Sequence, residues 1–123
     1  MAQKEKTVGN PLVHFEFMVS DVPKSREFYG KIFDWEFQHD DSRDYTMIKT
    51  GAEPGGGIMK KPHQAPHFGL DSYFLVDSID ETLEKATAAG AVPAMPKMEI
   101  PNIGWWAMFL DPDQIPVMIF QSK

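Results

Sequence analysis

The sequence predicts an α+β fold made of two copies of a β-α-β-β-β module. Residues 13–35 have the pattern of a strand followed by a helix. The same order returns from Tyr73, where the chain runs YFLVDSIDETLEKATAAGAV. A run of short, strand-like segments follows each helix pattern, so the two halves are expected to repeat one arrangement.

The first predicted strand has one apolar and one polar face. Side chains alternate between the two faces of a strand, and one face would carry Val13, Phe15, Phe17 and Val19. The other face would carry His14, Glu16 and Met18. We therefore expect the first face to join the core and the second to be available for chemistry.

A helix is predicted to follow this strand. Asp21 can cap its first turn, and the ring of Pro23 suits the backbone angle required there. Apolar side chains then recur at helical spacing, at Phe28, Tyr29, Ile32 and Phe33. This stripe is expected to cover the apolar face of the strand.

The second helix has its own start and stop signals. Ser78 and Glu81 have the spacing of a capping box. A buried stripe is expected from Ile79, Leu83 and Ala86, and Gly90 can take the left-handed conformation that ends a helix.

Six further strands complete the two modules. They are expected at Trp35–Gln38, Tyr45–Thr50, Gly57–Lys60, Val92–Met98, Gly104–Leu110 and Val117–Phe120. Pro93 and Pro96 indicate an edge strand, because proline cannot donate to a neighbouring strand. The run Trp105–Leu110 is apolar on both faces, which predicts a cover of helix on one side and of ligand or a partner chain on the other.

Two polar or flexible segments invite a functional interpretation. The glycines of residues 55–57 lack a following GK[ST] motif, so a strand whose backbone is closely approached is favoured over a phosphate loop. The polar segment 39–44 is interpreted as a hairpin tip in preference to a metal site. His63 and His67 have the spacing of a helical metal pair, but Pro66 argues against a helix.

Length and composition limit the class of protein. With 123 residues, the chain is expected to form a flexible lead at 1–10 and one domain at 11–121, divided into modules 11–61 and 69–121 by a linker at 62–68. No apolar run is long enough to cross a bilayer and no signal-peptide pattern begins the chain, which predicts no membrane association and a cytoplasmic location. Without cysteine, a metal would need histidine and carboxylate ligands.

Charge excludes one class of partner. The net charge is −6, and the basic residues form no cluster beyond Lys60-Lys61, so nucleic-acid binding is not expected. Only Arg26 and Arg43 could clamp an anion through a guanidinium group. A neutral or cationic small molecule is the favoured ligand.

Several motifs together resemble the vicinal oxygen chelate superfamily, which includes glyoxalase I, extradiol dioxygenases and metal-free bleomycin-resistance proteins. They are His14, Asp21, Phe28-Tyr29, Phe33-Asp34-Trp35, Gly90 and the DPDQ turn at 111–114. The runs GGGIM, YFLVDS and NIGWWAMFLDPD look most like its uncharacterised glyoxalase-like branch. The resemblance covers about residues 11–121. It implies a curved mixed sheet that forms a half-barrel around a cavity, and a homodimer.

The resemblance also implies four metal-ligand positions. His14 matches the first, whereas Gly57-Ile58-Met59 lacks the glutamate of the second. The third falls on Leu70 or Asp71, of which Asp71 is preferred, and the fourth falls on Met118, a poor ligand for these metals. A divalent Zn, Ni, Mn or Fe ion would therefore be held by His14 and Asp71 in an incomplete site.

Glu16 and a set of aromatic and methionine side chains are the other candidates. Glu16 could act as a general base or simply be solvated or paired with His14. The resemblance turns a further set toward the cavity, depending on register: Tyr45, Met47, Tyr73, Trp105, Trp106, Met108, Met118 and Phe120. Each could instead belong to the core, and Trp105 and Trp106 must point in opposite directions.

Two functions follow from these observations. The first is a glyoxalase-like lyase, isomerase or dioxygenase that acts on a small vicinal-oxygen substrate. The second is a metal-free protein that sequesters a small aromatic or cationic molecule, as bleomycin-resistance proteins do. The missing carboxylates favour the second, and the pair His14 and Glu16 supports the first.

Overall fold

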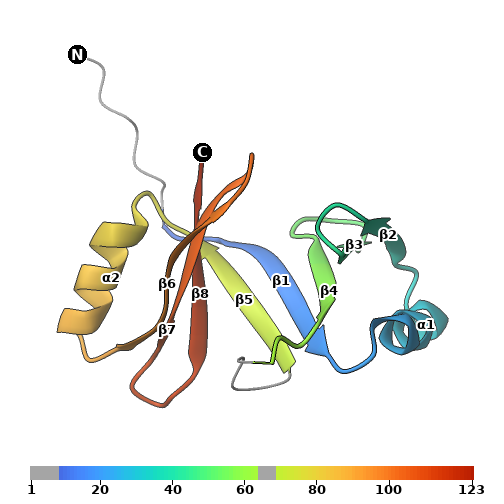
Figure 1. Cartoon of the computed structure of the whole chain (residues 1–123), viewed down its shortest axis with the longest axis horizontal. Coiled ribbons are helices and arrows are strands. Elements are labelled where there is room, and N and C mark those ends of the chain that lie inside the picture. Colours follow the sequence, from blue (N-terminus) through green and yellow to red (C-terminus); the bar gives the residue numbers. More distant parts are fainter. Residues whose placement is uncertain (1–8, 64–68) are drawn as a thin grey trace. The chain divides into compact units, whose positions relative to one another are not determined.

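The computed structural model describes residues 9–63 and 69–123, which group into two compact units (Figure 1). We call residues 13–72 the module-one unit, and residues 9–12 with 73–123 the module-two unit. Strand β5 (Gly69–Leu75) contributes to both. The predicted linker 62–68 and lead 1–10, with His67, lie largely outside the described residues.

The module-one unit contains helix α1 (Val22–Ile32) and a sheet whose strands lie in the order β2, β3, β4, β1. These strands are β1 (Leu12–Val19), β2 (Glu36–Asp40), β3 (Tyr45–Lys49) and β4 (Gly56–Lys60). Strands β1 and β4 are parallel, whereas β2, β3 and β4 are antiparallel neighbours. The order β-α-β-β-β of the prediction is confirmed for this half.

Strand register gives this sheet two chemically different faces. On the helix side, Phe15 pairs with Gly56, Thr46 with Ile58, and His39 with Thr46. The ring of Phe17 stacks on that of Tyr29 of α1, with centroids 4.8 Å apart. The predicted division of β1 is therefore confirmed, and His14, Glu16 and Met18 lie on the opposite side.

Helix α1 begins as predicted, but its apolar side chains are less buried than predicted. The Asp21 carboxylate accepts a hydrogen bond from the backbone N–H of Lys24 at 3.0 Å. Of the predicted stripe only Tyr29 is half-buried, whereas Phe28, Ile32 and Phe33 are 56%, 53% and 46% exposed. The prediction that all four cover the strand is wrong, because the sheet meets only one edge of the stripe.

The module-two unit has the same order of elements. Its strands lie in the order β5, β8, β7, β6, with β6 at Val92–Ile100, β7 at Gly104–Leu110 and β8 at Pro116–Ser122. Strand β6 is the edge strand that its prolines predict, and its register shifts on both sides of Met95. The pairing of β5 with β8 is parallel.

Helix α2 (Ile79–Ala88) covers the core of this second unit. Its start is capped by the Ser78 hydroxyl, which accepts from the N–H of Glu81 at 3.2 Å. Ile79 is fully buried with Ala107 and Ile119, and Leu83 packs against them. The two-module α+β prediction is therefore confirmed. Neither helix of the described ranges is long and apolar enough to cross a membrane.

Candidate functional site

A buried hydrogen-bond network lies on the side of the module-one sheet opposite α1. The Tyr45 hydroxyl donates to Oε1 of Glu16 at 2.9 Å and lies 2.7 Å from Nε2 of His14. Because a hydroxyl has only one proton to donate, this arrangement places a proton on Nε2, which donates to Tyr45. We call His14, Glu16 and Tyr45 the Tyr45 network. It joins three residues that the sequence singles out separately.

Gly57 makes the network possible. Tyr45 belongs to β3 and the other two residues belong to β1, with β4 between them. Gly57 of β4 is the register partner of Glu16 and of Met47. A Cβ atom at Gly57 would overlap the ring and hydroxyl of Tyr45. The tyrosine therefore crosses β4 in the space that a side chain would fill, and the predicted close approach is confirmed.

Both β1 members of the network are at least partly buried. Glu16 is only 6% exposed. Burial, and to a smaller extent the positive charge of Arg43, lowers the pKa of His14 from its ordinary value of 6.5. The imidazole is therefore neutral at pH 7. A neutral histidine and a buried glutamate that share one tyrosine hydroxyl form a unit through which a proton can be exchanged with a ligand.

The lowered pKa of His14 predicts a pH-dependent stability. The unfolded chain takes up this proton near pH 6.5, whereas the folded protein takes it up only at lower pH. Below about pH 6.5 the unfolded state therefore binds more protons, and the free energy of unfolding should fall as the pH decreases from 7.5 to 5.5. Urea unfolding at both pH values measures this fall. His14→Gln should show a smaller one, and an equal fall in the variant would contradict the assignment.

Arg43 forms the edge of the network. Its guanidinium carbon lies 5.5 Å from the centre of the Tyr45 ring, and its Nε donates to Oδ2 of Asp40 at 2.9 Å. Hydrogen bonds from Ser42 and Arg43 lower the pKa of Asp40 to about 2. Asp40 thus stays ionised and holds Arg43 over the tyrosine.

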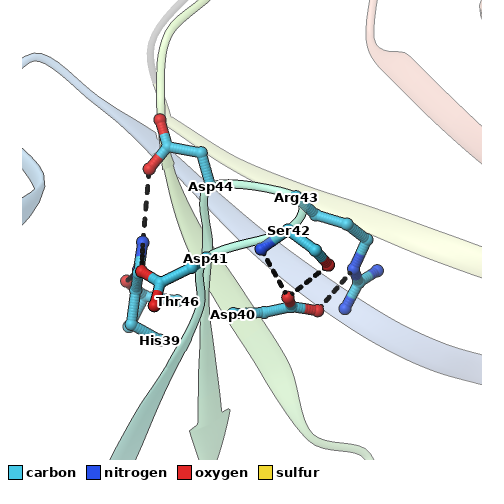
Figure 2. Close-up of polar contacts among 7 residues, drawn as sticks. All are labelled: His39, Asp40, Asp41, Ser42, Arg43, Asp44 and Thr46. Atoms are coloured by element: carbon cyan, nitrogen blue, oxygen red, sulfur yellow. Dashed lines mark hydrogen bonds and ion pairs between the residues drawn. The ribbon is translucent and has the colours of Figure 1, made fainter.

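The polar segment 39–44 forms the tip of the β2–β3 hairpin, as predicted. Figure 2 shows Asp40, Ser42 and Arg43 on one side of this tip, and His39 with Asp44 on the other. Nε2 of His39 lies 3.3 Å from Asp44 and 3.6 Å from Asp41, and its Nδ1 lies 3.0 Å from the Thr46 hydroxyl. Asp40 is hydrogen-bonded to Ser42 and Arg43 as in a structural turn, whereas the carboxylates of Asp41 and Asp44 are exposed beside His39.

The donors of the module-one unit do not form the ligand set of a typical divalent metal site. The ring nitrogen Nε2 of His14 is hydrogen-bonded to the hydroxyl of Tyr45, and Gly57 has no side chain that could bind a metal ion. Asp71 is buried on β5, with 2% of its surface exposed. Within residues 9–63 and 69–123, no three His, Asp or Glu side chains converge as a metal would require.

The other predicted pocket residues lie on several strands. Met47 shares the network's side of the module-one sheet, next to Gly57. Strand pairing in the module-two unit places five of them on the side opposite α2: Tyr73, Trp106, Met108, Met118 and Phe120. Trp105 lies on the α2 side, where it packs against the buried core and where the ammonium groups of Lys97 and Lys123 lie over its ring.

Comparisons with known proteins agree with this architecture. The family described as bleomycin resistance protein-like N-terminal matches residues 12–51, which include β1, α1, β2 and β3. Over 70 residues the chain is 34% identical to CFP32 of Mycobacterium bovis, whose name places it among glyoxylases. That match covers 57% of this chain and 27% of CFP32, so the chain spans about a quarter of this relative's length.

Two solved structures have a similar fold. One is a glyoxalase/bleomycin resistance protein/dioxygenase superfamily member from Vibrio splendidus, with a TM-score of 0.61, 13% identity, and coverage of 94% of this chain and all of the other. The second is homoprotocatechuate 2,3-dioxygenase from Brevibacterium fuscum in complex with 3,4-dihydroxyphenylacetate. Its TM-score is 0.66 at 20% identity, over 91% of this chain and 36% of the dioxygenase chain.

Proposed function

We propose that this chain belongs to the glyoxalase/bleomycin resistance/dioxygenase superfamily, which it resembles in part of its sequence and in its fold, and that it binds a small organic molecule at the Tyr45 network. The observation that carries the proposal is the position of the Tyr45 hydroxyl, between the neutral imidazole of His14 and the buried carboxylate of Glu16. Binding is by hydrogen bonds to an oxygen-bearing ligand, without a metal ion.

The network can also support proton transfer. A ligand hydroxyl that donates to the Glu16 carboxylate in place of Tyr45 would free the tyrosine proton, so an acceptor and a donor would then lie within one hydrogen-bonded unit, as general acid–base catalysis requires. In this proposal Glu16 is the general base, and Tyr45 and Met47 line the pocket. Isomerase or lyase chemistry would need no group beyond these.

Arg43 favours a ligand that carries a carboxylate next to its polar oxygens. The guanidinium lies over Tyr45, its Nε donates to Asp40, and its Nη2 makes a weaker contact with Sδ of Met47 at 3.7 Å, which a carboxylate could replace. The dioxygenase of similar fold was solved with 3,4-dihydroxyphenylacetate, a catechol with a carboxylate. Catechols of this kind are therefore the first ligands to test.

The binding proposal is tested by titrating 3,4-dihydroxyphenylacetate into isotope-labelled protein and following the amide resonances. Shifts are expected at His14, Glu16 and Tyr45, and Tyr45→Phe should weaken binding about 10- to 150-fold, since a lost hydrogen bond to a charged group costs about 1.5–3 kcal/mol. Tyr29→Phe is the matched control, because it removes a hydroxyl from the helix side of the same sheet. Equal binding by wild type and Tyr45→Phe would contradict the proposal.

A metal-dependent lyase, isomerase or dioxygenase is the second candidate, with His14 and Asp71 as ligands. It is supported by the imidazole on β1 and the buried carboxylate on β5. Metal content, measured after addition of Zn²⁺, Ni²⁺, Mn²⁺ or Fe²⁺, distinguishes the two candidates. Stoichiometric metal that is lost in His14→Ala would favour the second candidate, and no metal in any sample would favour the first.

Two further proposals concern the oligomeric state of the protein and its location in the cell. The apolar character of both faces of β7 supports a homodimer, with the partner chain covering the face opposite α2. A cytoplasmic location is the companion proposal, and it is supported by the absence of cysteine.

A further inference from the structure

We infer that the module-one unit has a second binding site, on the helix side of its sheet, for a small molecule that carries a carboxylate or phosphate group. The site is a cavity of about 560 Å³ between the first turns of α1 and strands β2, β3 and β4. This volume lies within the usual range of ligand pockets. The inference does not depend on the proposed function, because the Tyr45 network lies on the other face of the sheet.

The floor of the cavity is polar. Thr46 and His39 are directly opposite each other on β3 and β2. Thr46 is only 1% exposed, and its hydroxyl lies 3.0 Å from Nδ1 of His39 (Figure 2). A hydroxyl has one proton to donate, so Thr46 can donate to a ligand oxygen when Nδ1 of His39 carries a hydrogen and donates to Thr46.

Two cations border this floor. Arg26 of α1 is exposed and lines the cavity, with its guanidinium carbon 5.7 Å from the centre of the Phe37 ring. Lys60 ends β4 on the same side as Ile58, the register partner of Thr46. Neither cation forms an ion pair with any residue that the structure describes. An arginine fork beside a lysine is an arrangement suited to carboxylate and phosphate oxygens.

The acidic side chains around the cavity have partners of their own. Oε1 of Glu27 lies 3.1 Å from Nζ of Lys31, and Oδ1 of Asp44 lies 3.3 Å from Nε2 of His39. Their carboxylates are therefore directed to groups other than the two cations. Glu27 and Asp44 line the cavity together with Arg26 and Lys60, and the two cations offer contacts for an anion although the net charge of the chain is −6.

Amide resonances of the full chain, followed during separate titrations with inorganic phosphate and with succinate, test the inference. Either anion should shift Thr46, His39 and Lys60, and the tighter probe identifies phosphate or carboxylate as the preferred group. Arg26→Gln and Lys60→Gln should each weaken binding about five- to tenfold, as expected for loss of a charge-assisted hydrogen bond. Glu27→Gln should strengthen binding about twofold, because it removes a nearby negative charge.

Lys49→Gln is the matched control. It makes the same change of charge as Lys60→Gln but lies on the strand face that Tyr45 and Met47 share, so binding should stay within about twofold of wild type. The inference would be overturned if neither anion shifts Thr46, or if Lys49→Gln weakens binding as much as Lys60→Gln. Tyr45→Phe should leave anion binding unchanged, which separates this site from the Tyr45 network.

Discussion

Replacing Gly57 with alanine is expected to lower the free energy of unfolding by about 1–3 kcal/mol, the usual cost of placing extra atoms in a packed site. The added methyl group would occupy the space that the Tyr45 ring and hydroxyl fill. The tyrosine would have to leave the position from which it bonds to Glu16 and His14. Chemical unfolding measures the loss of stability, and titration with 3,4-dihydroxyphenylacetate should show weakened binding in the same variant.

Gly30→Ala provides the matched control for this substitution. Gly30 lies within α1, and a Cβ atom there would make only an ordinary contact, 3.6 Å from the Phe37 ring. Alanine favours the helix by about 0.5–1 kcal/mol over glycine, so this variant should be as stable as wild type or more so. In a Tyr45→Ala background Gly57→Ala should cost much less than alone. A full cost in that background would show that Tyr45 is not the cause.

The part of the site that lies on one strand could be predicted from the sequence. Alternation alone places His14 and Glu16 together on the face of β1 opposite the helix, and the structure confirms this face. The hydrogen bond from Tyr45 could not be predicted, because it depends on β4 pairing with both β1 and β3. Gly57 was the available signal, because a glycine within a strand often marks a place where another group approaches the backbone closely.

The exposure of the apolar stripe of α1 and the presence of the helix-side cavity could not be predicted from the sequence, and the physical reason is the same for both. Helical spacing shows which side chains of α1 share a face, but not how far a four-stranded sheet extends beneath them, so Phe28 and Ile32 remain exposed. The cavity combines Arg26, Thr46 and Lys60, which come from three elements and meet only through strand pairing and the packing of α1 on the sheet. The periodicity of one segment carries no information on its contacts with other segments. The helix caps Asp21 and Ser78 depend only on their neighbours in the sequence, and they were predicted correctly.

The Tyr45 network should behave energetically as one unit, which a double-mutant cycle can measure. Tyr45→Phe removes the donor to a carboxylate that is only 6% exposed, and a buried polar group that loses a hydrogen bond costs about 1–3 kcal/mol. Glu16→Gln removes the charge that strengthens this bond, so it should also be destabilising. The double variant should lose less stability than the sum of the single variants, by about 0.5–3 kcal/mol.

A second cycle, of Glu16→Gln with Tyr29→Phe, tests whether this coupling is specific. Tyr29 stacks on Phe17 on the helix side of the sheet, away from Glu16, so the two effects should add to within about 0.5 kcal/mol. Coupling in the first cycle alone would mean that Glu16 and Tyr45 act together. A ligand that needs the Tyr45 hydroxyl should then bind weakly to Glu16→Gln as well. Additive effects in the first cycle would instead show that the hydroxyl and the carboxylate contribute independently, and would remove the basis for proton transfer between them.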